Sequence, residues 1–514
     1  MPLRLSAQEL PVIRGPLVTA LPGAGDALEP VPGRRPLTYT PDMTEDPRVH
    51  AFRDDALGDL DATGVAARIA IGDVSAREVV QAAIERAETV QDQLNGIEVR
   101  DFERALRLAS APRGGVFSGV PTIVKDNVDV AGLPTGQGSS AFTPAPARRD
   151  SDFVTQFQST GAVSIGKSRL PEFGFSAATE YADADPVRNP WNPEYSPGAS
   201  SGGSAALVAS GVLPFAHAND GGGSIRIPSA ACGLVGLKPT RGRTVADAAD
   251  KTMPVRLVTQ GVVTRSVRDT ARFFAAAENY YRNPKLPPIR LVERPGSTRL
   301  RIGVIVDSVA GVPTDDETRK SVHATAELLA GLGHHVEDAA LPVGQWFKHD
   351  FELYWGFLAF AISTGGKRMF GPTFDRTKTD NLTRGLDALY RKHMVETPRM
   401  LYRLQRTQRT YSQMFQKYDV VLSPVLAHTT PKLGYLSPAQ DFETLFPRLA
   451  TYAAFTPLNN VSGGPAISLP LHQTSTGLPL ASHFSADLGD ERTLLELAFE
   501  LEEARPWRRI QDQP

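Results

Sequence analysis

The pattern that most restricts the fold is an alternation of amphipathic segments with short runs of β-branched residues. Ser75 and Glu78 have the spacing of a helix capping box, and apolar residues recur at helical intervals after them, which predicts a helix over residues 76–94. A β-branched run predicts a buried strand over residues 120–126. The alternation continues with a helix over residues 151–160, strands over 162–165, 301–306 and 418–423, and helices over 315–331 and 491–505. This order of elements favours an α/β fold.

The first 50 residues differ from the rest, because nine of the 41 prolines of the chain fall there. Proline lacks the backbone N–H that helices and sheet ladders need. We therefore expect an extended N-terminal arm over residues 1–55, with the folded part of the chain after it.

Charge and cysteine content exclude several classes of protein. The 55 basic and 57 acidic residues give a net charge of −2, which is not the electrostatic signature of a nucleic-acid-binding protein. The single cysteine, Cys232, excludes an intramolecular disulfide framework and suits a reducing compartment. No run approaches 18 consecutive apolar residues, the length of a membrane span. We expect a soluble cytoplasmic protein without a nucleic-acid partner.

Residues 161–168 match the phosphate-loop formula letter for letter, which raises the alternative of a nucleotide-binding protein. A phosphate loop must lie between a strand and a helix, so that its free N–H groups face the phosphates. Here the intervening residues themselves have the pattern of a strand, and Pro171 follows closely. This context makes nucleotide binding a distant alternative.

Residues 198–202 match the nucleophile-elbow formula of α/β-hydrolases, which would make Ser200 the nucleophile. An elbow needs a hydrophobic strand immediately before it. Residues 188–197 are proline-rich and polar instead, so this interpretation lacks its structural context.

A longer pattern joins Lys125 at the end of a predicted strand, Ser200-Ser-Gly-Gly-Ser204, and Gly221-Gly-Gly-Ser-Ile-Arg226. Together with the segments that follow, these residues resemble the amidase signature family, and the resemblance covers roughly residues 58–508. It implies one large α/β domain over residues 56–510, with a mixed central sheet flanked by helices on both faces.

The resemblance also implies the roles of the site residues. Ser224 would be the nucleophile, and Ser200, which follows a cis peptide bond in the family, would relay its proton to Lys125. That lysine must be neutral, so burial must lower its pKa from the usual value of about 10.4. Three successive glycines can turn backbone N–H groups towards one point. The expected oxyanion hole consists of the N–H groups of Gly221, Gly222, Gly223 and Ser224.

Neighbouring residues are expected to support this site rather than to react. We assign supporting roles to Ser201, Asp220 and Arg226. Alternation along the strand sends the Asp126 side chain to the face opposite Lys125. The apolar neighbours of Cys232 predict a buried thiol of the core. The chain departs from the usual family pattern at Ala199, where glycine is common, and at Asn219, where threonine is common.

The most aromatic stretch of the chain covers residues 351–362. Apolar stripes with helical spacing are usually core, so a buried helix is the first interpretation. As a second hypothesis, Trp355 and Phe351 line an apolar acyl or aryl pocket, because ligand pockets favour aromatic walls.

The sequence thus predicts a hydrolase that cleaves a small-molecule carboxylic amide through a serine acyl-enzyme, with ester cleavage as a side activity. It predicts no metal and no organic cofactor. Anilides, carbamates, lactam oligomers and aliphatic amides remain open as substrates, and so does the oligomeric state, a homodimer included. A closer rival function is that of a glutamine amidotransferase subunit for tRNA-dependent amidation, which resembles the same family.

Overall fold

The computed structural model describes residues 46–309 and 311–512. Most of the arm expected over residues 1–55 therefore lies outside the described residues. The compact unit begins at Pro47, and Val49 and Ala51 are buried in its main core. The buried core thus includes described residues before position 55, within the expected arm.

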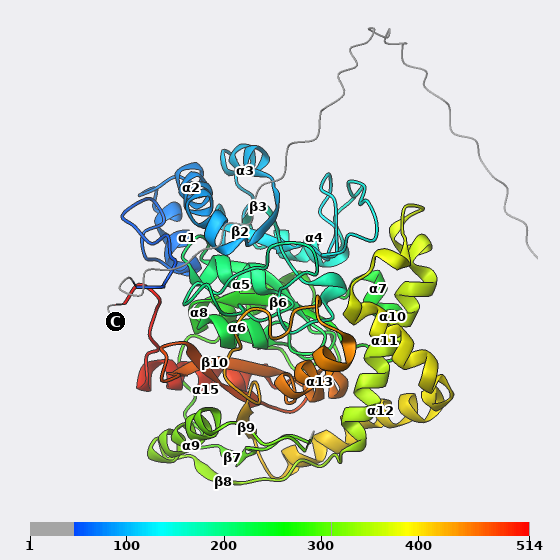
Figure 1. The fold of residues 1–514 in the computed structure, drawn as a ribbon. Helices are drawn as coiled ribbons and strands as arrows, with labels where there is room; N and C mark the ends of the chain where they lie inside the picture. The colour runs from blue at the N-terminus through cyan, green and yellow to red at the C-terminus, as the bar shows by residue number, and fades with distance from the viewer. Residues whose placement is uncertain (1–45, 310, 513–514) are drawn as a thin grey trace, which may run out of the picture. The chain divides into compact units, whose positions relative to one another are not determined.

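The larger sheet is mixed and, within the described residues, has eight strands (Figure 1). Five antiparallel pairings connect its first six strands, and the last two pairings are parallel. Its spatial order is β4 (Phe215–Asp220), β6 (Thr259–Thr264), β5 (Val235–Lys238), β10 (Ala466–Gln473), β11 (Pro479–Ser485), β9 (Val420–Pro424), β7 (Arg301–Val304) and β8 (His335–Asp338).

A smaller sheet of the described region holds three strands in the order β1 (Ile97–Arg100), β3 (Val163–Ser168) and β2 (Pro121–Lys125). It packs beside β4, the edge strand of the larger sheet. The Thr122 hydroxyl of β2 donates a hydrogen bond of 3.1 Å to the Phe215 carbonyl of β4. This contact joins the beginnings of the two strands, and near their other ends the Lys125 Nζ lies 2.7 Å from the Asn219 Oδ1.

Helices flank both sheets (Figure 1). The α-helices are α1 (Ala62–Ala70), α2 (Ala76–Leu94), α3 (Phe102–Ala109), α4 (Asp152–Gln158), α5 (Gly202–Ala209), α6 (Arg226–Cys232), α7 (Ala248–Thr252), α8 (Val267–Tyr280), α9 (Asp316–Gly331), α10 (Trp346–Phe370), α11 (Asn381–His393), α12 (Thr397–Ser412), α13 (Phe442–Tyr452), α14 (Pro457–Ser462) and α15 (Glu491–Ala504). Short 3-10 turns are η1 (Glu172–Gly174), η2 (Arg376–Lys378), η3 (Met394–Glu396) and η4 (Gln413–Gln416). In the described part of the chain, none of these helices combines the length and apolar character that crossing a bilayer requires.

The elements predicted from the sequence are present with small differences at their ends. The helix α2 begins directly after Ser75, whose side chain and that of Glu78 form the reciprocal capping box. The strand β3 extends to Ser168, three residues beyond the prediction. The expected α/β architecture, a large domain of mixed sheet flanked by helices, is confirmed.

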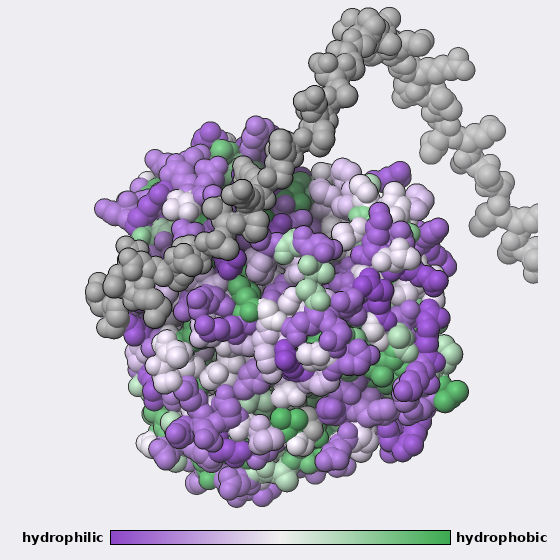
Figure 2. All heavy atoms as spheres, in the orientation of Figure 1, coloured by the Kyte–Doolittle hydropathy of each residue, from purple (hydrophilic) through white to green (hydrophobic). Residues whose placement is uncertain are grey.

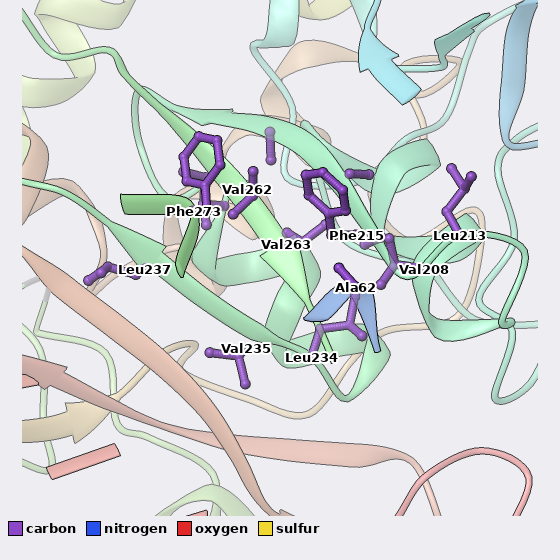
Figure 3. Close-up of a cluster of buried hydrophobic side chains, with 14 of the residues drawn as sticks. Ala62, Val208, Leu213, Phe215, Leu234, Val235, Leu237, Val262, Val263 and Phe273 are labelled. Atoms are coloured by element: carbon purple, nitrogen blue, oxygen red, sulfur yellow. The ribbon is translucent and has the colours of Figure 1, made fainter. Parts of the chain in front are cut away.

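The main hydrophobic core lies where β4, β5 and β6 meet the surrounding helices. Figure 3 shows part of this cluster, in which Phe215 and Val263 of the sheet lie near Phe273 of α8 and Val208 of α5. All four side chains are fully buried. The face of the protein drawn in Figure 2 is by contrast largely hydrophilic, with hydrophobic residues scattered over it. This packing fixes β4, whose end carries the candidate site.

Candidate active site

Lys125 ends β2 and reaches across to the larger sheet. Its Nζ lies 2.7 Å from the Ser200 Oγ and 2.7 Å from the Asn219 Oδ1. The side chain is fully buried, and this burial lowers the pKa of its ammonium group to about 7, although the Asp220 carboxylate acts in the opposite direction. A substantial fraction of the Lys125 amine is therefore neutral near pH 7, whereas an exposed lysine is almost entirely protonated there.

Ser200 lies in the loop that leads into α5, and the peptide bond between Ala199 and Ser200 is cis. The cis bond expected from the family resemblance is thus present, with alanine in place of the usual glycine. The side chain of Ser200 is buried and faces Lys125, and the Ser201 hydroxyl donates to the Asn219 carbonyl at 3.4 Å. Ser201 thereby ties this loop to β4.

Ser224 lies in the turn between β4 and α6, at the end of the glycine run. It lines the same cavity as Ser200. Among the residues that the structure describes, no hydrogen bond joins the two serine hydroxyls. The structure thus brings Lys125 and Ser200 into direct contact and places Ser224 beside them in one cavity.

The four expected oxyanion donors are not equivalent. The Gly223 N–H donates to the Asp220 carboxylate at 2.7 Å, so this amide is occupied within the protein. The expected oxyanion donors whose N–H groups are not bonded to Asp220 are therefore Gly221, Gly222 and Ser224, and their role stays a prediction. The physical reason is that the Gly223 N–H points towards the buried Asp220 carboxylate.

Asp220 and Arg226 form a fully buried ion pair beneath the glycine loop. The carboxylate also accepts the backbone N–H groups of Gly223 and Ile225 and the amide of Asn460. Burial alone would raise the pKa of Asp220, but the adjacent guanidinium outweighs that effect and holds the pKa well below its usual range. The pair therefore stabilises the turn that carries Ser224. Neither side chain is among the residues that line the cavity.

Two hollows that share lining residues adjoin Ser224. The larger, of about 830 Å³, is lined by both polar and apolar residues, including Ser200, Asn219 and Ser224. The second is narrow, about 70 Å³, and its wall is apolar apart from a few positions. Its apolar lining includes Ala177, Ala199, Ile227, Phe347, Leu449 and Ala453.

Trp355 and Phe351 of α10 lie over the glycine loop. A Cβ built on Gly222 would stand 3.4 Å from the Trp355 ring and 3.5 Å from the Phe351 ring. The two rings stack on each other with centroids 5.3 Å apart, and the Trp355 Nε1 donates to the Phe175 carbonyl at 3.1 Å. Both side chains line the hollows beside Ser224, so the aromatic stretch is a helix that also forms a cavity wall.

The alternative motifs have other structural roles. Residues 163–168 of the phosphate-loop match form the strand β3, and the Lys167 Nζ lies 2.6 Å from the Asp126 carboxylate in a buried pair, which excludes a phosphate loop there. The same pair shows that Asp126 points away from Lys125.

Residues 188–197, all described, contain no strand that could precede an elbow. Cys232 is buried in the core, where burial raises the pKa of its thiol, so this prediction is confirmed.

Two residues in contact with Lys125 escaped the sequence-based prediction. Asn219 accepts from the lysine side chain, and the His217 Nδ1 accepts the lysine backbone N–H at 3.1 Å. Burial lowers the pKa of His217 to about 3, so this ring is neutral. Both lie on β4 at alternate positions, so their side chains share one face of this strand. No group of three or more potential metal ligands occurs in the described ranges 46–309 and 311–512.

Comparison with known proteins gives a consistent assignment. The model of the Amidase family matches residues 78–495, most of the chain. AmiC of Mycobacterium leprae, named as a candidate amidase, is 52% identical over 465 residues, which cover 90% of this chain and 99% of that protein.

Two further similarities concern one kind of enzyme. The 6-aminohexanoate-cyclic-dimer hydrolase of Pseudomonas sp. strain NK87 is 32% identical, over 87% of this chain and 95% of that protein. A solved structure of 6-aminohexanoate cyclic dimer hydrolase with its substrate superposes with a TM-score of 0.79, at 29% identity, over 89% of this chain and 99% of that one. Fold and sequence similarity thus extend over nearly the full length of these relatives.

Proposed function

Because the chain belongs to the Amidase family and is a hydrolase of amide C–N bonds, we propose that it acts through a serine acyl-enzyme, with Ser224 as nucleophile. The observation that carries this proposal is the buried contact of 2.7 Å between Lys125 and Ser200, beside Ser224. A base with a pKa near 7 that is shielded from water suits general-base catalysis.

In the proposed first half-reaction, the Ser224 oxygen forms a bond to the amide carbonyl carbon. Its proton passes to Ser200, whose own proton passes to neutral Lys125. The resulting oxyanion accepts hydrogen bonds from the N–H groups of Gly221, Gly222 and Ser224, each of which is worth roughly 10²–10³ in rate. Protonated Lys125 returns a proton through Ser200 to the amine as the C–N bond breaks.

In the second half-reaction, water attacks the acyl ester, and the same relay takes up its proton and then returns one to Ser224. The products are a carboxylic acid and an amine, and the enzyme ends in its original protonation state. Esters of the same acyl group should also react, because their leaving group needs less protonation than an amine.

Trp355 and Phe351 contribute to the apolar wall of the narrow hollow beside Ser224. This wall supports the proposal that the substrate places an acyl or aryl group there. The similarity to 6-aminohexanoate-cyclic-dimer hydrolase supports an oligomeric amide within this class. We propose a small-molecule amide or carbamate with an apolar acyl portion as the substrate, with no cofactor.

The proposal is tested by treating the protein with a fluorophosphonate and mapping the adduct by mass spectrometry. We expect an adduct on Ser224, no adduct in Ser224→Ala, and much slower labelling in Lys125→Ala. Ser229→Ala is a matched control, since this hydroxyl is buried in α6 and has no hydrogen-bond partner among the residues that the structure describes. Labelling on Ser200 with Ser224 unmodified would overturn the assignment of the nucleophile.

A further inference from the structure

Asn219, at the end of β4, is the second group that holds the Lys125 amine. Its Oδ1 accepts from the Lys125 Nζ at 2.7 Å and from the Asn127 Nδ2 at 3.2 Å. Its own Nδ2 donates to the Asn127 Oδ1 at 3.0 Å. The two amides thus pair reciprocally, and the pairing keeps the oxygen of Asn219 towards the lysine. Asn219 is 5% exposed, so bulk water does not compete strongly for this contact.

The chemistry of the lysine explains what such an acceptor contributes. A neutral amine has two N–H bonds and one lone pair, and it acts as a base only if that lone pair faces the proton it is to take. An amide oxygen accepts hydrogen bonds and cannot donate them. The Asn219 Oδ1 therefore holds an N–H of Lys125 in both protonation states and leaves the lone pair of the neutral amine for Ser200.

The surrounding charges make an uncharged acceptor necessary. Asp220 of β4 is paired with Arg226 of α6, and Asp126 of β2 is paired with Lys167 of β3. His217, the other titratable group of β4 in contact with Lys125, is neutral. A carboxylate at position 219 would add an unpaired negative charge directly at the ammonium group and would favour its protonated form.

We infer that Asn219 is a positioning residue that orients the Lys125 amine towards Ser200 without adding charge, held in place by Asn127. The inference rests on the proposed function, because it concerns the base of that relay. It also gives a role to one of the two positions at which the chain departs from the common family pattern.

The first experiment compares pH profiles of kcat/KM for the wild type and Asn219→Asp, using a nitroanilide substrate. The added carboxylate should move the acidic limb upwards by about one to three pH units. Activity at pH 7 should then fall, and much of it should return at alkaline pH. Asn283→Asp is the matched control, because it adds the same charge away from the site. The Asn283 side chain forms hydrogen bonds with the Gly242 carbonyl and the Lys285 backbone N–H. Its profile should equal that of the wild type.

A second pair of variants separates hydrogen bonding from shape and serves if Asn219→Asp does not fold. Asn219→Thr keeps an oxygen acceptor. Asn219→Val places a side chain of nearly the same shape as threonine there, without an acceptor. We expect the valine variant to lose about 10²-fold in kcat with little change in KM, and the threonine variant to recover most of that loss. Thermal unfolding of both variants reports whether the fold is retained.

An unshifted acidic limb in folded Asn219→Asp, or equal activity of the threonine and valine variants, would overturn the role of Asn219. Failure of the proposed function is distinguishable from this result. It would appear in the wild type, as absence of a fluorophosphonate adduct on Ser224, whatever the residue at position 219.

Discussion

The Lys125 Nζ and the Ser200 Oγ are 2.7 Å apart although the two residues lie in different elements, β2 and the loop before α5. Burial brings the pKa of this lysine to about 7, and no imidazole within the described ranges forms a hydrogen bond with Ser200. His217 accepts a hydrogen bond from the backbone N–H of Lys125, and no hydrogen bond between its ring and the Lys125 Nζ occurs in the described part of the chain.

The dependence of kcat/KM on pH should therefore follow the protonation of Lys125. The base must be neutral, so kcat/KM should rise with pH through about 7 and fall below it, as the lysine becomes protonated. Lys125→Arg should be inactive throughout, because a guanidinium does not lose its proton in this range. A profile with its acidic limb below pH 5, as neutral His217 would give, contradicts the assignment; the measurement is initial rate against pH with a chromogenic amide.

Removal of the buried acid should destabilise the whole protein. Asp220→Ala leaves the fully buried Arg226 without its counter-charge and should lower the free energy of unfolding by about 3–5 kcal/mol. Asp152→Ala breaks the half-exposed pair with Lys251 and should cost less than about 1 kcal/mol. Urea unfolding followed by circular dichroism measures both. Equal effects of the two variants would show that the Asp220 pair does not brace the loop.

Two glycines of the loop should respond differently to alanine. At Gly223, with φ of +137°, a Cβ would lie 2.3 Å from the Thr456 Oγ1, so Gly223→Ala should lower the melting temperature and reduce kcat by about 10² or more. At Gly221 the nearest atom to a Cβ is 3.3 Å away, and alanine keeps the N–H. Gly221→Ala should stay within about tenfold of the wild-type kcat. The reverse order of activities would contradict this description of the loop.

Trp355 should determine preference for the acyl group. Trp355→Ala removes a ring that covers the glycine loop and should raise KM about tenfold for aryl and longer acyl amides, with a smaller effect on acetyl amides. Trp346→Ala, at the first residue of α10 and outside the lining of both hollows, is the control. A series of acyl p-nitroanilides measures the preference. Unchanged KM values across the series would exclude Trp355 from the acyl site.

Local patterns predicted much of the fold, and long-range contacts account for what they missed. Ser75 and Glu78 determine the start of α2 through contacts only three residues apart, so the sequence was sufficient. The contact of Asn219 with Lys125 joins residues 94 positions apart and depends on how two sheets pack. The amide direction at Gly223 depends on a backbone angle that no residue pattern specifies.

The division of the site between two sheets has a consequence for how activity relates to folding. Lys125 belongs to the three-stranded sheet, whereas Asn219 is the penultimate residue of β4 in the larger one. The amine meets its partners only when the edge of one sheet docks on the other. The rate of hydrolysis therefore reports whether the two sheets are docked. Mild denaturants that separate the sheets should abolish turnover while most of the helical circular dichroism signal persists.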